Sequence, residues 1–91
     1  MTAATYIRSG RTLHRNAGPD VLVMVPGVER LHVLSGPAAV IWEILGDGAR
    51  IEDVTEDAAR LYGCTVGEIR SSVESCARTL ARHGLVEERR V

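Results

Sequence analysis

The segment LSGPAAVIWEILGDGA, residues 34–49, is apolar on nearly every side of a short predicted helix. Between Pro37 and Leu45, Glu43 is the only charged residue, and Trp42 is the only tryptophan of the chain. A helix that is apolar all round must be covered by the rest of its domain. We therefore interpret it as a buried core helix. The alternatives are a ligand pocket or the signature of a particular module.

The residues around this segment predict where helices begin and end. A helix over 37–45 has Ser35 as its expected N-cap and Gly46 as its stop. The GDG turn that follows is too short for a phosphate loop, and it comes after a helix rather than before one. A second helix over 51–62 is predicted from apolar residues at helical spacing, and Gly63 is expected to end it.

The third helix has the clearest boundaries. Thr65 and Glu68 form a T-x-x-E capping box at its start. Gly84 is expected to end the helix, with Leu85 folding back onto the last turn. The final residues 87–91, EERRV, are predicted to form a loose tail. One stripe of the helix is apolar and is expected to face the core: Val66, Ile69, Val73, Cys76, Ala77 and Leu80.

The first third of the chain is predicted to form strands and turns. Residues 20–25, DVLVMV, are apolar on both faces and suit a central strand. Residues 29–34, ERLHVL, form the next strand after a Pro-Gly turn. A weaker first strand covers residues 12–18, or is the end of a strand that begins near Thr5. The predicted fold class is α+β, with a three-stranded antiparallel sheet followed by three helices.

Length and composition fit one small globular domain over residues 1–91, with an ordered core of about 5–87. The net charge is -1, which argues against a nucleic-acid partner. Two cysteines without a C-x-x-C motif indicate the reducing cytoplasm. The chain has neither an apolar run long enough to span a membrane nor a signal peptide at its start, so we expect no membrane partner.

Side chains that carry chemistry are present but scattered. None of His14, His32 and His83 has a second ligand at metal-binding spacing. Cys76 is interpreted as a buried structural thiol, whereas Cys64 lies in the turn before the third helix without a histidine nearby in the sequence. The acidic residues of the second helix lie on its polar face. We therefore expect no enzyme activity, no catalytic residue, no metal and no cofactor.

Two features favour a peptide-binding role. The strand ERLHVL contains no Pro, Gly or Lys, so its backbone groups are open to a partner strand if it lies at a sheet edge. A plain amphipathic third helix with a solvated outer face is the alternative to a binding wall. One flank of that helix mixes charge with a small residue, as a groove wall does: Arg70, Glu74 and Ala81. The other flank carries Ser72, Thr79 and His83.

Four parts of the chain resemble a known family: the strand that ends at Leu34, SGPAAVIWEILGDG at 35–48, VTEDAARLY at 54–62 and the closing L-x-x-x-GLV at 80–86. They are similar to the PqqD-like family, also called RiPP recognition elements. These proteins bind the leaders of ribosomally synthesised and post-translationally modified peptides. The resemblance runs from residue 20 to residue 86. Its departures are local: Ser35 stands where the family often has Asn, and Pro37 where a small residue is common.

The resemblance implies a winged helix-turn-helix-like fold without catalytic activity. A leader peptide would add as an antiparallel strand to the third strand and rest against the third helix. The bound leader would be presented to a separate maturation enzyme. That enzyme would be a leader protease and cyclase in lasso-peptide biosynthesis, or a radical-SAM enzyme in the pyrroloquinoline quinone pathway. The implied leader-binding residues are Arg30, Leu31, His32, Val33, Leu34, Ile69, Arg70, Val73, Glu74 and Ala77.

Two other functions stay open at this point. A winged-helix DNA-binding regulator would have a similar fold, although Arg70 is the only base in residues 65–77. An interaction subunit, for example a weak homodimer formed by edge pairing, is the second alternative to a monomeric adaptor.

Overall fold

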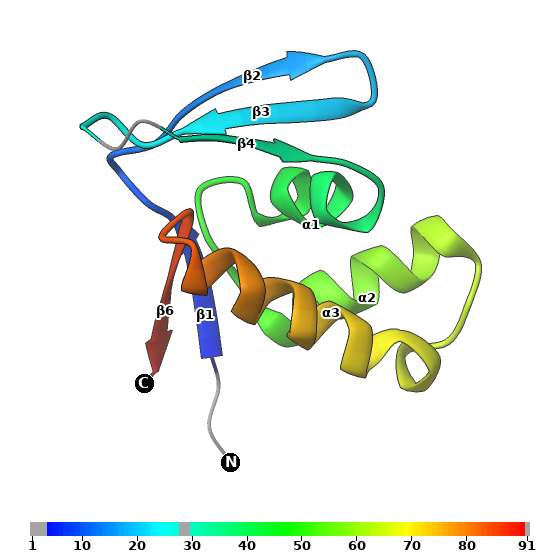
Figure 1. Cartoon of the computed structure of the whole chain (residues 1–91). Helices are drawn as coiled ribbons and strands as arrows, with labels where there is room; N and C mark the ends of the chain where they lie inside the picture. The colour runs from blue at the N-terminus through cyan, green and yellow to red at the C-terminus, as the bar shows by residue number, and fades with distance from the viewer. Residues whose placement is uncertain (1–3, 28–29, 91) are drawn as a thin grey trace.

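The computed structural model describes residues 4–27 and 30–90, and its α+β class confirms the prediction (Figure 1). Antiparallel strands come first and the helices follow, as expected. Three further strands extend this order: one before the predicted three-stranded sheet, one between the first two helices and one after the last helix. The elements are β1 (Ala4–Arg8), β2 (Leu13–Ala17), β3 (Asp20–Met24), β4 (Leu31–Leu34), α1 (Pro37–Leu45), β5 (Ala49–Arg50), α2 (Ile51–Tyr62), α3 (Val66–Arg82) and β6 (Val86–Arg90).

Strands β2, β3 and β4 form one antiparallel sheet in that order, with β3 in the centre as predicted. The register pairs Val21 with Leu34 and Val23 with His32 across β3 and β4. Because side chains alternate between faces, these residues share one face of the sheet. Val21, Val23 and Leu34 are buried in the same core cluster as Trp42 of α1. Figure 1 shows β4 as the strand of this sheet that lies nearest the helices.

A second sheet, in the order β5-β1-β6, corrects two predictions. Residues 87–91 were expected to form a loose tail, but Val86–Arg90 is a strand that pairs along β1 from Ala4 to Arg8. The N-terminal region holds two separate strands, β1 and β2, rather than one. Tyr6 of β1 is buried, and its hydroxyl donates a 2.6 Å hydrogen bond to Glu88 Oε1 of β6. This pairing joins the two ends of the described chain.

Helix α1 is buried as predicted, and Trp42 has no exposed surface. The expected N-cap was wrong, because Gly36 rather than Ser35 occupies that position, with φ of 57° and no capping side chain. At the other end, Arg8 Nη2 donates a 2.6 Å hydrogen bond to the carbonyl of Trp42. The Arg8 guanidinium also lies 4.6 Å from the centre of the Trp42 ring. Arg8 therefore covers the indole and satisfies a carbonyl in the last turn of the helix.

Helices α2 and α3 confirm the boundaries expected from their capping residues. The Thr65 side chain accepts from the Glu68 N–H while Glu68 accepts from the Thr65 N–H, which completes the capping box. The hydrogen bonds that the Glu68 carboxylate accepts from the Thr65 N–H and from the Thr65 hydroxyl lower the pKa of Glu68. At the end of α3, the Leu85 N–H donates to the Leu80 carbonyl, which is the expected fold-back onto the last turn. Among the described residues, none of the helices is long and apolar enough to cross a membrane.

Candidate peptide-binding site

Strand β4 lies at an open edge of its sheet in the part of the chain that the structure describes. Leu31 and Val33 are 54% and 56% exposed, whereas His32 is half-buried and Leu34 is buried. Arg30, predicted as part of the binding strand, lies exposed just before it. Every second residue of an edge strand directs its N–H and C=O away from the sheet. These groups are the ones that an added strand would pair with.

The other sheet edges are less suited to strand addition. β2 carries Arg15 and Asn16, and β5 is only two residues long. β6 has the sequence VEERR, and charged side chains of this kind protect an edge from pairing. Among the described strands, β4 is therefore the edge with the fewest obstacles to a partner strand.

The structure also shows which side of α3 lies toward β4. The rings of His32 in β4 and His83, the C-cap of α3, lie 5.3 Å apart between their centres. Residues seven apart share a stripe of a helix, because two turns take about 7.2 residues. Ile69 and Cys76 therefore lie on the same stripe as His83, and both are partly buried against the core. We call these three residues the 69–76–83 stripe.

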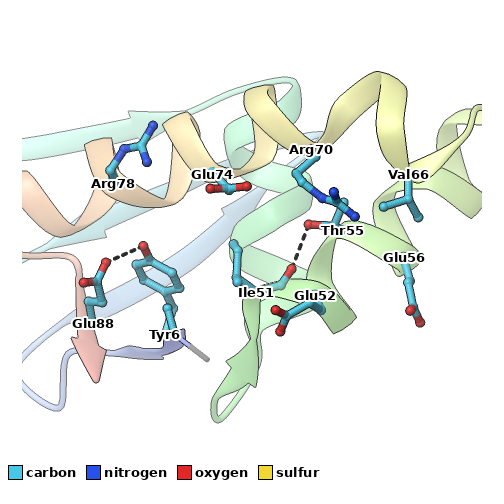
Figure 2. Close-up of a pocket in the computed structure, with 11 residues that line it drawn as sticks. Tyr6, Ile51, Glu52, Thr55, Glu56, Val66, Arg70, Glu74, Arg78 and Glu88 are labelled. Carbon is cyan, nitrogen blue, oxygen red and sulfur yellow. Dashed lines mark hydrogen bonds between the residues drawn. The ribbon is translucent and has the colours of Figure 1, made fainter. Parts of the chain in front are cut away.

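The other predicted α3 residues have different surroundings. Val73 and Ala77 are buried in the core, so they support the helix from beneath and do not form an open wall. Arg70 and Glu74 line a separate groove of about 470 Å³ between β1, α2 and α3. Figure 2 shows them above Tyr6 and Ile51. By helical periodicity Ile69 falls on the same side of α3 as His83, whereas Arg70 and Glu74 lie on another flank.

The sequence did not single out Cys76 and His83 as candidate wall residues. Cys76 was predicted to lie in the apolar stripe of α3, and His83 was predicted to lie on its second flank. The preference for the Arg70 flank rested on its mixture of charged and small residues. Only the packing of α3 against the sheet distinguishes the two flanks, and local sequence does not encode that direction.

The family model described as "Coenzyme PQQ synthesis protein D (PqqD)" matches residues 20–86. The chain belongs to the PqqD family. This is the family of RiPP recognition elements, and the PqqD match supports a peptide-binding role in natural product biosynthesis. PqqD-type recognition proteins are generally non-catalytic. Comparisons with curated proteins and with solved structures find no match. The PqqD match includes β3, β4 and all three helices, whereas β1 and β2 lie outside it.

Three basic side chains, Arg30, His32 and His83, lie where β4 of this PqqD-family protein meets the end of α3. Burial lowers the pKa of His32, and the neighbouring His83 and then Arg30 add to that lowering. The described residues form two ion pairs, Arg50–Glu52 and Asp57–Arg60, and neither involves this cluster. The site therefore places these basic side chains at one end of a strand edge that carries no acidic residue.

The His32 pKa predicts that folding stability of the PqqD domain falls as pH drops through 6.5, the ordinary value for histidine. As the pH falls, His32 is protonated in the unfolded chain before it is protonated in the folded protein. The free energy of unfolding therefore decreases between pH 6.5 and the lower pKa of the folded state. Urea unfolding at several pH values between about 7.5 and about 5.5 would measure this, and the His32→Gln variant should show a weaker dependence. An identical pH dependence in both proteins would contradict the prediction.

Proposed function

We propose that this protein binds the leader of a precursor peptide by strand addition to β4 and presents it to a separate maturation enzyme. The observation that carries the proposal is the open, uncharged edge of β4 in a member of the RiPP recognition element family. Main-chain hydrogen bonds to β4 would give affinity, and side-chain contacts would give specificity. The protein itself would perform no chemistry on the leader.

The specificity of such a site depends on what the added strand contacts on α3. Alternate leader side chains would point toward the helices. There they would meet the 69–76–83 stripe, where Ile69 and Cys76 are partly buried. A direct role for Arg70 and Glu74 in setting charge preference stays a prediction, because these residues line the groove beside Tyr6.

The charge at one end of β4 favours a particular kind of leader. Arg30, His32 and His83 lie together there. A leader with an Asp or Glu side chain at this end would place a carboxylate beside them, which favours binding. We therefore propose that the leader has an apolar segment flanked by an acidic residue.

A titration of this protein with the fluorescently labelled leader of a candidate precursor peptide tests the proposal. We expect saturable binding that survives moderate salt, because main-chain and apolar contacts carry it. A labelled DNA duplex serves as the control and should not bind. Steep salt-dependent binding to the duplex, without binding to the leader, would favour a DNA-binding regulator instead.

Thiol labelling locates the bound leader. Burial raises the pKa of Cys76, so its thiolate is scarce and iodoacetamide should react with it slowly at neutral pH. Bound leader should slow this reaction by about tenfold or more if it covers the stripe. The Cys64→Ser variant leaves Cys76 as the only thiol, and the reciprocal Cys76→Ser variant is the control. Equal protection of both thiols would argue against a site beside β4.

A further inference from the structure

The face of the β2-β3-β4 sheet that points away from the helices is unusually apolar. The register pairs Leu22 with Val33, Met24 with Leu31, and Leu13 with Met24. These residues alternate with the buried ones, so they share the opposite face. The four most open of them are 44–63% exposed. We call the following set the outer apolar face: Leu13, Leu22, Met24, Leu31 and Val33.

A leader strand on β4 would leave the outer apolar face uncovered. Strand addition uses the edge of β4, in the plane of the sheet, whereas the outer apolar face is perpendicular to that plane. A hollow of about 310 Å³ lies on it, lined by Leu13, Leu22, Met24 and Leu31. One-sided antiparallel sheets normally carry polar residues on their outer face. Clustered exposed apolar side chains of this kind mark interaction surfaces.

The charges around the outer apolar face indicate the chemistry of its partner. Arg15 lines the hollow, and the exposed Arg11 and Arg30 come just before β2 and β4. Asp20 is the only carboxylate within the three strands, and it lies at the hairpin end, where it lines a hollow beside α1. A second copy packed face to face would therefore bring like charges together. A protein surface that is apolar with a rim of Asp or Glu is complementary.

We propose that the outer apolar face is the docking surface for the maturation enzyme, which would carry an apolar patch with a carboxylate rim. This inference rests on the proposed leader-binding function. A leader strand on β4 would continue the sheet, so its outward side chains would extend the outer apolar face. The enzyme would then contact adaptor and leader together and bind the loaded adaptor more tightly. By linkage, the enzyme would raise the affinity for the leader by the same factor.

The test measures the affinity of the candidate maturation enzyme for this protein, with and without saturating leader. The Leu13→Gln/Met24→Gln variant changes the outer apolar face away from β4. We expect enzyme affinity to fall by about tenfold or more, with leader affinity changed by less than about twofold. The Arg15→Glu variant should also weaken the enzyme complex. The matched control is Leu61→Gln on α2, where the side chain is 68% exposed but lies on another surface.

Unchanged enzyme affinity in the folded double variant would overturn the inference. So would loss of leader binding in that variant, because the outer apolar face would then belong to the leader site. Light scattering that shows a wild-type dimer and a monomeric double variant would assign the face to a second copy instead. Binding to anionic phospholipid vesicles that the double variant loses would assign it to a lipid surface. If the wild-type protein does not bind leader, only the proposed function is contradicted. The enzyme affinity measured without leader still tests the outer apolar face.

Discussion

Proline at one of two neighbouring β4 positions, His32 or Val33, is expected to abolish leader binding while the fold survives. Consecutive residues of an edge strand direct their N–H groups to opposite sides. One of the two therefore bonds to β3, and the other is free for the leader. Proline at the free position removes a donor that the sheet does not use, which edge strands tolerate. The measurement is leader titration of each variant, with circular dichroism to establish folding.

The opposite edge of the same sheet provides the control for this experiment. Arg15→Pro and Asn16→Pro form the equivalent pair on β2. The variant of this pair that folds should bind leader with unchanged affinity, because β2 is separated from β4 by β3. Leader binding by a folded His32→Pro protein and by a folded Val33→Pro protein would rule out strand addition at β4.

Replacing Trp42 by alanine is expected to destabilise the protein by about 3–5 kcal/mol. The side chain is fully buried between Arg8, His14 and the core, so its removal leaves a cavity. That cost is a large fraction of the about 5–15 kcal/mol that stabilises a typical domain. Urea unfolding measures the change in the free energy of unfolding.

Trp42→Phe is the matched variant. Within the described residues the indole Nε1 has no hydrogen-bond partner, so phenylalanine removes ring volume without breaking a hydrogen bond. We expect a clearly smaller loss of stability than with alanine. A loss below about 1 kcal/mol for the alanine variant would contradict the interpretation of Trp42 as a core residue.

The helical half was predictable because its signals are local. A capping box places Thr65 at the start of α3, and the glycines at positions 63 and 84 adopt the left-handed conformations that end α2 and α3. The exception was the start of α1, where Gly36 adopts a positive φ and takes the capping position from Ser35. Ser35 and Gly36 both precede Pro37, so the local sequence allows either of them as the N-cap. The direction in which the chain enters the helix decides between them, and tertiary packing sets that direction.

The second sheet was not predictable because its pairing joins residues about eighty positions apart. The sequence EERR lacks an apolar pattern. Consecutive charged residues near the end of the sequence therefore predicted a solvated tail. The buried residues of this pair of strands are Tyr6 in β1 and Val86 in β6, and each lies opposite a charged residue, Glu88 and Arg8 respectively. The local sequence likewise gives no signal that marks Arg8 as a structural residue. Its contact with Trp42 depends on the β1 position that this pairing fixes.

Amide hydrogen exchange of β4, with and without saturating leader, tests the central claim most directly. Strand addition predicts that an amide among residues 31–34, exchanging freely in the unbound protein, becomes strongly protected when leader binds. The amides on the open side of β6 should exchange at the same rate in both states. Saturable leader binding without a change in β4 exchange, or with protection confined to the groove beside Arg70, would contradict the account.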